Sequence, residues 1–213
     1  LQELIGATDR ENWAVILAGG RGTRLRPLTD TVPKPMLRVA GRPILERIVL
    51  HLVGSGFQRI FLSVNHLAHI IEDHFQDGTK FGCRIDYLRE QQPLGTGGPL
   101  ALLPERPEHP LLLMNGDLVT QADMGLLLDF HAEGKYAATL GVRPYSIQVP
   151  FGVVDTEGGR LIRIREKPTE RLLVNAGIYV IGPEVLPMVT DDREFPITEL
   201  VQRCLEAGLP VGV

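Results

Sequence analysis

The chain has 213 residues, of which 44% are hydrophobic and 23% are charged, as in an ordinary soluble globular protein. Its formal net charge of −4 at pH 7 argues against a protein dedicated to nucleic acid. No apolar run is long enough for a membrane helix and the start has no signal-peptide pattern, so we expect a cytoplasmic protein without a membrane partner.

The length suits one large α/β domain rather than two independent ones. The first twelve residues are polar and without a clear period, so we assign residues 1–12 to a linker and residues 13–213 to the domain. The chain begins without Met, and Leu209–Val213 stops as a new strand begins, so we expect a domain truncated at its C-terminal end. A homo-oligomer is compatible with the sequence.

The domain opens with its most informative stretch, Trp13–Glu46. Ala14–Ala18 is a short apolar run with two β-branched residues, which predicts a buried central strand. Three glycines follow, and a glycine-rich backbone can turn tightly and offer successive N–H groups to phosphate oxygens. Four cations gather around the glycines: Arg21, Arg24, Arg26 and Lys34. The stretch therefore predicts a phosphate-binding loop.

Strand-like and helix-like segments then alternate. The apolar patterns predict, in chain order, a strand at Met36–Val39, a helix at Arg42–Val53, a strand at Arg59–Val64, a helix at Leu67–Phe75, a strand at Arg84–Leu88, a helix at Thr96–Leu103, a strand at Pro110–Met114, a helix at Asp123–Glu133 and a strand at Tyr136–Val142. We expect the helix at 123–133 to direct Leu126, Leu127 and Phe130 inward.

The pattern changes after residue 150. Phe151–Asp155 and Arg160–Arg165 flank a turn at Glu157-Gly158-Gly159, which predicts a β-hairpin. After it we predict a long strand at Arg171–Ile181 and helices at Pro183–Val189 and Pro196–Ala207. This order predicts an α/β fold: a doubly wound, Rossmann-like, mostly parallel sheet flanked by helices, with a late antiparallel hairpin addition.

Ligands of doubly wound sheets bind beyond the carboxyl ends of the strands. Three candidate loops follow the predicted strands that end at Ala18, Leu88 and Met114, so we expect all three loops at one edge of the sheet. The second loop is the glycine-rich Glu90–Gly98, and the third is Asn115-Gly116-Asp117.

The first loop fits neither of two common phosphate-binding patterns. The chain has no Walker spacing, and Leu25 stands where a dinucleotide fingerprint needs its third glycine. The stretch closely resembles the signature of the sugar-1-phosphate nucleotidyltransferases, also called nucleoside-diphosphate-sugar pyrophosphorylases. Their pattern of A-G-G-x-G-T-R-L-x-P-L-T, then P-K-P-M and G-x-P, is met in register by Ala18–Thr29, Pro33–Met36 and Gly41–Pro43.

The resemblance implies transfer of a nucleotidyl group from an NTP to a sugar 1-phosphate, with pyrophosphate released. It implies that Arg24 and Lys34 are the catalytic residues, which hold the phosphates in the transition state. It also implies these nucleotide-binding residues: Leu17, Ala18, Gly19, Gly20, Arg21, Gly22, Thr23, Glu90, Gly95 and Thr96.

The cofactor implied by the resemblance is Mg²⁺. Asp117 ends a hydrophobic strand, and the matching aspartate of the family is a metal ligand. The family's second metal aspartate lies in a W-x-D-x-G segment, which this sequence does not contain, since its only Trp is Trp13.

Glu90 bears on the choice of base. In the resembled family this position faces the base edge, and members that use pyrimidines tend to have Gln there. A carboxylate only accepts hydrogen bonds, so it matches the N1–H and N2–H₂ donors of guanine better than it matches uracil. Together with the following loop, Pro93–Gly98, this favours GTP and the mannose-1-phosphate or heptose-1-phosphate guanylyltransferase type.

The resemblance also implies a sugar-phosphate site, which the late hairpin addition would help to form. Lys167 would pair with the phosphate of the sugar, and Glu166 and Asn175 would hydrogen-bond sugar hydroxyls. Gly152 would let the backbone approach the sugar, and Asn115 belongs to the same predicted group.

Two alternatives stay open. One is a uridylyl- or thymidylyltransferase that acts on a glucose-like 1-phosphate. The other is a non-catalytic homologue that senses a sugar nucleotide, although such a protein would be expected to lose Arg24, Lys34 or Asp117, and all three are present.

The remaining histidines and cysteines are interpreted as structural. His66, His69 and His74 lack a third ligand at metal-binding spacing, so we take them as surface or lining residues. Cys83 and Cys204 are far apart without C-x-x-C spacing, and we expect two small buried side chains rather than a disulfide or zinc site.

Overall fold

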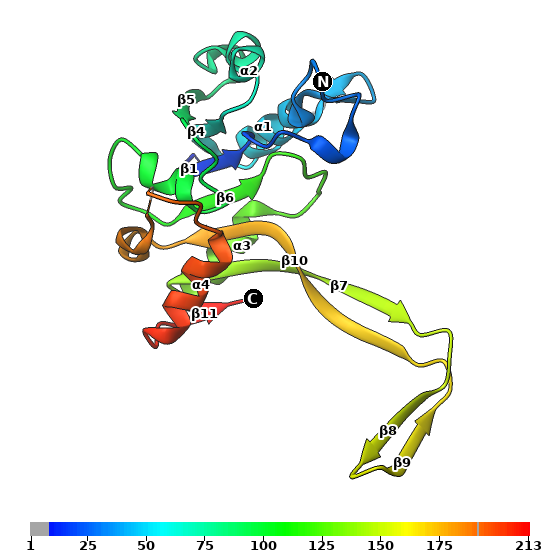
Figure 1. The fold of residues 1–213 in the computed structure, drawn as a ribbon. Helices are drawn as coiled ribbons and strands as arrows, with labels where there is room; N and C mark the ends of the chain where they lie inside the picture. The colour runs from blue at the N-terminus through cyan, green and yellow to red at the C-terminus, as the bar shows by residue number, and fades with distance from the viewer. Residues whose placement is uncertain (1–8, 191) are drawn as a thin grey trace.

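The computed structural model of the protein describes residues 9–190 and 192–213 (Figure 1). Residues 1–8 of the predicted linker lie outside the described residues. Residues 10–12 are not linker, because the first strand, β1, spans Arg10–Leu17. The Arg10 amide donates to the Gly56 carbonyl at 2.8 Å and the Asn12 side chain donates to the Pro110 carbonyl at 2.7 Å. Polar residues thus begin this strand because neighbouring backbone satisfies them.

The described part of the chain builds a seven-stranded central sheet in the order β11-β7-β10-β6-β1-β4-β5. The strands besides β1 are β4 (Phe57–Val64), β5 (Arg84–Arg89), β6 (Leu111–Asn115), β7 (Ala138–Gln148), β10 (Thr169–Ile181) and β11 (Val211–Gly212). Strand β1 pairs in parallel with β4 and β6, and β4 pairs in parallel with β5. Strand β10 runs antiparallel to both β6 and β7. The predicted mostly parallel, mixed sheet is confirmed.

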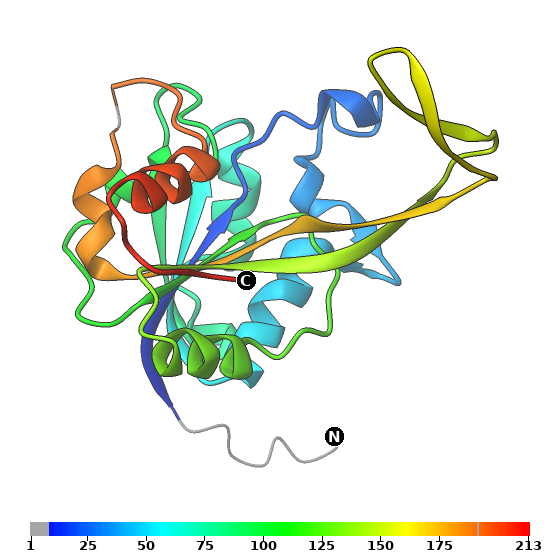
Figure 2. The same cartoon turned by 90° about the horizontal axis from the view of Figure 1, so that it is seen from below.

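Helices cover both faces of the sheet (Figure 2). One face carries α1 (Ile44–Gly54), α2 (Ala68–Phe75) and α3 (Met124–Glu133), and the other carries α4 (Ile197–Glu206) with the 3-10 helices η4 (Gly98–Leu102) and η5 (Pro183–Met188). Each face of the sheet has its own hydrophobic core. On β1, Ile16 packs in the core under α1, α2 and α3, Val15 packs in the core under α4, η4 and η5, and both are fully buried. Burial on both faces explains the apolar runs Trp13–Leu17 of β1 and Ile60–Leu62 of β4. Among the described residues, no helix has both the length and the apolar character needed to cross a bilayer.

Several predicted boundaries shift at prolines. Helix α1 begins at Ile44 because Arg42–Pro43 forms β3, which pairs with β2 (Arg38–Val39). The predicted strand at 36–39 shrinks to β2 because Lys34–Met36 forms the 3-10 helix η2. The predicted helices at 96–103 and 183–189 are the short 3-10 helices η4, with one proline, and η5, with two, and proline cannot donate a backbone hydrogen bond.

The predicted inward face of α3 is wrong for Leu126 and Phe130, whereas Leu127 packs against the core as predicted. Leu126 is 66% exposed and Phe130 is 39% exposed, whereas Met124, Leu128 and His131 are buried. Three consecutive leucines occupy positions 126–128, so the apolar pattern fits more than one rotation of the helix. Packing of Met124 and Leu128 against the sheet selects the rotation that the sequence did not indicate.

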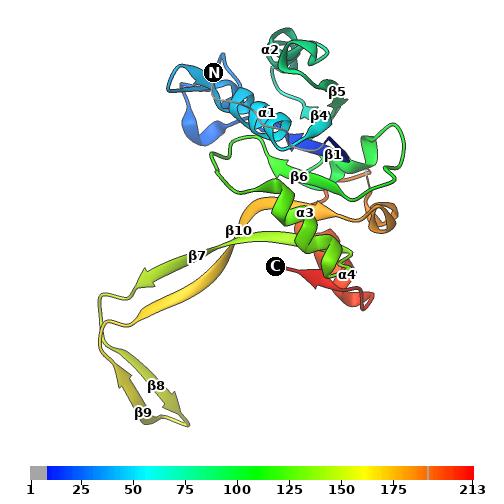
Figure 3. The same ribbon diagram turned by 180° about the vertical axis from the view of Figure 1, so that it is seen from behind.

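A long two-stranded arm leaves the body of the protein (Figure 1, Figure 3). We use "the arm" for residues 143–174, which comprise the outer parts of β7 and β10 and the hairpin between them. The predicted hairpin is confirmed as β8 (Val153–Glu157) and β9 (Arg160–Arg165), which pair antiparallel. Gly158 and Gly159 both have positive φ, 53° and 82°, as a tight two-residue hairpin turn requires.

Candidate active site

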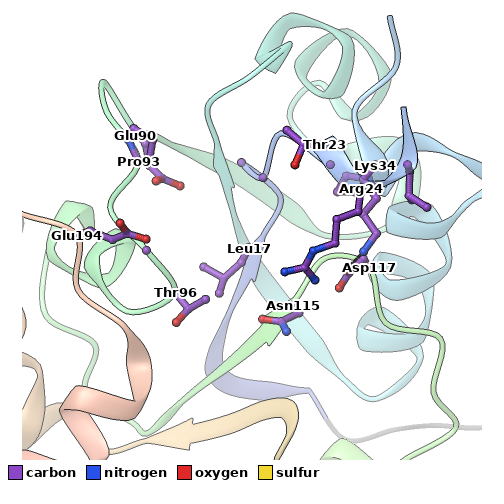
Figure 4. A pocket seen from close by; sticks show the side chains of 16 residues that line it. Leu17, Thr23, Arg24, Lys34, Glu90, Pro93, Thr96, Asn115, Asp117 and Glu194 are labelled. Carbon is purple, nitrogen blue, oxygen red and sulfur yellow. Dashed lines mark hydrogen bonds and ion pairs between the residues drawn. The ribbon is translucent and has the colours of Figure 1, made fainter. Parts of the chain in front are cut away.

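A cleft of about 470 Å³ lies at the carboxyl ends of β1, β5 and β6 (Figure 4). It is lined by Leu17, Gly19, Gly20, Gly22, Thr23, Arg24, Leu25, Lys34, Pro35, Glu90, Pro93, Gly95, Thr96, Asn115, Asp117 and Glu194. Residues from all three predicted loops contribute, so the expected convergence at one sheet edge is confirmed.

The first loop is shaped by a close approach at Gly22. Its φ of +61° lies in the left-handed region, and a Cβ there would lie 2.9 Å from Thr29 Cγ2 and 3.1 Å from Lys34 Cβ. The buried Thr29 hydroxyl donates to the Gly22 carbonyl at 2.9 Å and closes the loop on itself. Only glycine lets the loop pack this tightly against the segment that carries Lys34.

Replacing Gly22 with alanine tests this packing, with Gly41→Ala as its control. Gly41 has a similar φ of +82°, but a Cβ at Gly41 would meet nothing within 4 Å. Both variants should lose about 1–2 kcal/mol of unfolding free energy from left-handed strain, measured by denaturant titration. Only Gly22→Ala should also weaken NTP binding, by at least about tenfold, because the new methyl group displaces Lys34. Equal NTP affinity in the two variants would contradict this role of Gly22.

Two of the loop cations face the cleft. Arg24 lies in the 3-10 helix η1 (Thr23–Leu25), Lys34 begins η2, and both line the cavity. Arg26 instead forms an ion pair with Asp30 at 3.4 Å. Arg21 is exposed and does not line the cavity. The predicted catalytic pair is therefore brought together, and Arg21 is not brought into the cavity with it.

The third loop directs Asp117 toward Lys34. The Gly116 amide donates to the Leu17 carbonyl at 2.9 Å, and a Cβ on Gly116 would lie only 2.6 Å from that oxygen. This contact joins the ends of β6 and β1, and the next residue, Asp117, forms an ion pair from its Oδ2 to Lys34 Nζ. The cleft thus holds a cation and a carboxylate in direct contact, both with partly exposed side chains.

The residues present fit a Mg²⁺ ion that is shared with phosphates rather than enclosed by protein. In the described part of the chain, no group of three His, Cys, Asp or Glu side chains could hold a metal ion. Asp117 offers one carboxylate at the mouth of the cleft. Mg²⁺ commonly binds one or two carboxylates and completes its shell with water and substrate phosphates. Asp117 is therefore the residue that would hold the ion.

Glu90 is held in place by four hydrogen bonds. Its Oε1 accepts from the Ser63 hydroxyl, and its Oε2 accepts from the Leu94 amide at 3.0 Å. Its backbone carbonyl accepts from the Asn65 side chain at 2.8 Å, and its amide donates to the Val64 carbonyl at 2.9 Å. Both carboxylate oxygens keep a free lone pair, so the group can still accept from a ligand in the cleft.

The second loop is joined to the start of α4. Phe195 donates its amide to the Leu94 carbonyl at 2.8 Å and accepts from the Gly97 amide at 2.8 Å. The Thr96 hydroxyl accepts from the Ile197 amide at 2.9 Å, in the first turn of α4. These contacts bring Glu194 to the cleft wall opposite Arg24 and Lys34 (Figure 4). Glu194 was not predicted, because only long-range pairing to the second loop places it there.

The predicted sugar-phosphate residues fall into two places. Asn115 lines the cleft. Asn175 accepts from the Gly177 amide at 2.9 Å, and a side chain on Gly177 would collide with Asn115, so both asparagines lie beside Gly177 on the neighbouring strands β10 and β6. The hydroxyl of Tyr179 accepts from Asn175 at 2.6 Å, and burial raises the pKa of this tyrosine.

The remaining three predicted sugar residues lie on the arm. Glu166 and Lys167 follow β9, and a Cβ on Gly152 would lie 3.3 Å from Glu166 Oε2, so Gly152 and Glu166 are neighbours. None of the three lines the cavity. The structure therefore gathers Gly152, Glu166 and Lys167 at one place but does not bring them to the cleft. Ala18, one of the predicted nucleotide-binding residues, does not line the cavity either. It is buried, and its amide donates to the Ser63 carbonyl at 2.8 Å.

The other reactive side chains have structural surroundings. His74 Nε2 lies 2.9 Å from Glu46 Oε2. Both cysteines are free and buried, and burial raises the pKa of the Cys83 thiol to about 11. A thiol with so high a pKa is a poor nucleophile near neutral pH.

Comparisons with known proteins show the family to which the chain belongs. The sequence profile described as "Nucleotidyl transferase" matches residues 13–212. A mannose-1-phosphate guanylyltransferase of Mycobacterium tuberculosis is 36% identical over 190 residues, which cover 86% of this chain and 52% of that protein. A UTP–glucose-1-phosphate uridylyltransferase of Synechocystis is 33% identical over 217 residues, which cover 92% of this chain and 56% of that protein. The chain therefore spans about half the length of the curated relatives it matches.

A solved structure shows the same fold. The crystal structure of HddC from Yersinia pseudotuberculosis, complexed with GMP-PN, aligns with a TM-score of 0.64 at 25% identity. The alignment covers 87% of this chain and 83% of HddC.

Proposed function

Because this chain belongs to the nucleotidyl transferase family, we propose that it carries the active site of a sugar-1-phosphate nucleotidyltransferase. The reaction is NTP plus sugar 1-phosphate giving NDP-sugar plus pyrophosphate, with GTP the favoured nucleotide. The observation that carries the proposal is the convergence of Arg24, Lys34 and Asp117 with the glycine loop in one cleft.

The transfer is an in-line displacement at the α-phosphorus of the NTP. An oxygen of the sugar phosphate forms the new P–O bond, and the bond to the β-phosphate breaks as pyrophosphate leaves. Both reactants are anions, so the main requirement is to hold them together and to neutralise the charge that develops. Cations fixed at the edge of a folded sheet meet this requirement without reorganising during the reaction.

Each residue has a distinct role in this proposal. The backbone of the glycine loop accommodates the triphosphate, and Arg24 presents a planar fork to its oxygens. Lys34 acts as a point charge between the reacting phosphates. Asp117 would hold Mg²⁺, which would neutralise phosphate charge.

The base preference is assigned to Glu90. Guanine presents two neighbouring donors, N1–H and N2–H₂, and the two carboxylate oxygens of Glu90 each keep a lone pair that could accept one of them. The GMP-PN of the HddC complex and the guanylyltransferase name of the Mycobacterium relative support this preference. The uridylyltransferase name of the Synechocystis relative favours the alternative base, so the choice needs a direct test.

Glu90→Gln is the variant that tests this assignment. The glutamine oxygen can still accept from the Leu94 amide, and its NH₂ group can donate to Ser63, so the loop should stay folded. We expect kcat/KM for GTP to fall at least about tenfold relative to that for UTP, because a donor now faces the guanine donors. Glu194→Gln removes one charge from the same cleft and should leave the GTP-to-UTP ratio unchanged. An equal shift in both variants would contradict base reading by Glu90.

The experiment that tests the proposed function is product analysis. GTP, UTP, CTP and dTTP are each incubated with mannose, glucose and heptose 1-phosphates, and NDP-sugar and pyrophosphate are quantified. GDP-sugar is the expected main product. A sensing homologue would bind nucleotide sugar without producing pyrophosphate in any combination, and that outcome would overturn the proposal.

A further inference from the structure

We propose that Ser63 is a specificity-determining positioning residue, which acts on the base preference by orienting the Glu90 carboxylate. The inference rests on the proposed function, because it concerns how that site distinguishes nucleotides. Neither the phosphate-loop pattern nor the three loop segments include Ser63, which stands inside an apolar strand.

Ser63 is a fully buried hydroxyl in a strand of apolar neighbours. It lies near the carboxyl end of β4, between Leu17 of β1 and Leu88 of β5. A buried hydroxyl without a partner would destabilise the folded protein, so the Ser63 hydroxyl needs a hydrogen bond. That bond is made to Glu90 Oε1, across the gap between two parallel strands.

The bond fixes a carboxylate that lies against the phosphate loop. A Cβ on Gly19 would lie 2.9 Å from Glu90 Oε1, so this oxygen reaches the backbone of the loop that follows β1. The Leu94 amide holds the other oxygen from the opposite side. Ser63 and Leu94 together set the plane of the carboxylate between the glycine loop and the second loop.

Orientation matters because a glutamate side chain has several rotatable bonds. Without the Ser63 hydroxyl, Oε1 loses its donor, and the Glu90 side chain can leave the position in which it lines the cleft. A hydroxyl can donate to a carboxylate or accept from an amide NH₂. Ser63 therefore suits either Glu or Gln at position 90, whereas alanine suits neither.

The test compares Ser63→Ala with Ser63→Thr, which keeps the hydroxyl. We expect the ratio of kcat/KM for the preferred base over the other, GTP against UTP, to fall about tenfold in Ser63→Ala and to return toward the wild-type value in Ser63→Thr. A purely structural role of Ser63 would lower kcat/KM for GTP and kcat/KM for UTP by the same factor. An unchanged ratio in a folded Ser63→Ala protein, or a uniform loss with both nucleotides, would overturn the inference.

A double-mutant cycle isolates the pair. If Ser63 acts through Glu90, then Ser63→Ala should not change the ratio further in a Glu90→Ala background. A further change there would place the effect elsewhere and overturn the inference. Equilibrium binding of GTP and UTP gives the same ratio without turnover, so it tests Ser63 even if the protein releases no pyrophosphate. Absence of turnover with selective binding would overturn the proposed function and leave the Ser63 inference standing.

Discussion

Lys34→Met is expected to lower the rate of pyrophosphate release by about 10²–10³-fold, the cost of removing one fixed group that stabilises transition-state charge. Lys34 lines the cleft at the first position of η2 and is the ion-pair partner of Asp117. Methionine keeps the length and apolar character of the stem but removes the charge, so packing against Gly22 should persist. The measurement is steady-state release of pyrophosphate at saturating nucleotide.

Lys80→Met is the matched control for Lys34→Met. Lys80 also lies in a 3-10 helix, η3 (Thr79–Phe81), and is exposed outside the cleft. It should keep the wild-type rate within about twofold, since exposed substitutions of this kind change little. A Lys34→Met protein as active as Lys80→Met would show that Lys34 has no part in the reaction.

Asp117→Asn is expected to cause a loss of similar size, about 10²–10³-fold, and to raise the Mg²⁺ concentration needed for the half-maximal rate. Asparagine is nearly the same shape and can still accept a hydrogen bond from Lys34, so the fold should be kept. It lacks the negative charge that strengthens the binding of a hard divalent cation. Activity is measured across a Mg²⁺ titration.

Asp129→Asn provides the control for charge loss alone. Asp129 lies on α3, forms an ion pair with Arg10 at 3.8 Å and does not line the cleft. Removal of its charge should therefore leave the Mg²⁺ dependence unchanged. An Asp117→Asn protein with the wild-type rate and the wild-type Mg²⁺ requirement would contradict the metal role of Asp117.

The parts of the molecule that are local in sequence could be predicted. The apolar run of β1, the glycine loop and the strand preceding Asp117 each carry their own signal, and parallel pairing brings their ends to one edge. The Gly158-Gly159 turn likewise carries the positive φ values that a tight hairpin needs.

The parts that depend on distant pairing could not be predicted. Glu194 reaches the cleft only because Phe195 forms hydrogen bonds with Leu94 and Gly97. These partners lie about a hundred residues earlier in the chain; the neighbouring bond from Ile197 to Thr96 spans 101 residues. Ser63 gave no signal, since a single serine in an apolar strand does not indicate which side chain it contacts. The rotation of α3 was ambiguous because three leucines in a row fit several helix faces.

The sugar side is where sequence and structure differ most. The order of Gly152, Glu166 and Lys167 along the chain suggested residues that act with the cleft. In the structure they lie on the arm, while Asn115 and Asn175 lie on the neighbouring strands β6 and β10 of the body. Their role in holding the sugar phosphate therefore stays a prediction, to be tested with Lys167→Met and the KM for sugar 1-phosphate.

Transfer of the nucleotidyl group from an NTP to a sugar 1-phosphate in this cleft can be followed with labelled GTP. GTP labelled at the α-phosphorus is incubated with Mg²⁺ and mannose 1-phosphate, and the fate of the label is followed. Label is expected to enter a GDP-sugar only when sugar 1-phosphate is present, and Lys34→Met is expected to prevent this transfer. Label that stays in the nucleotide, or that appears as GMP regardless of sugar 1-phosphate, would rule out nucleotidyl transfer to the sugar phosphate.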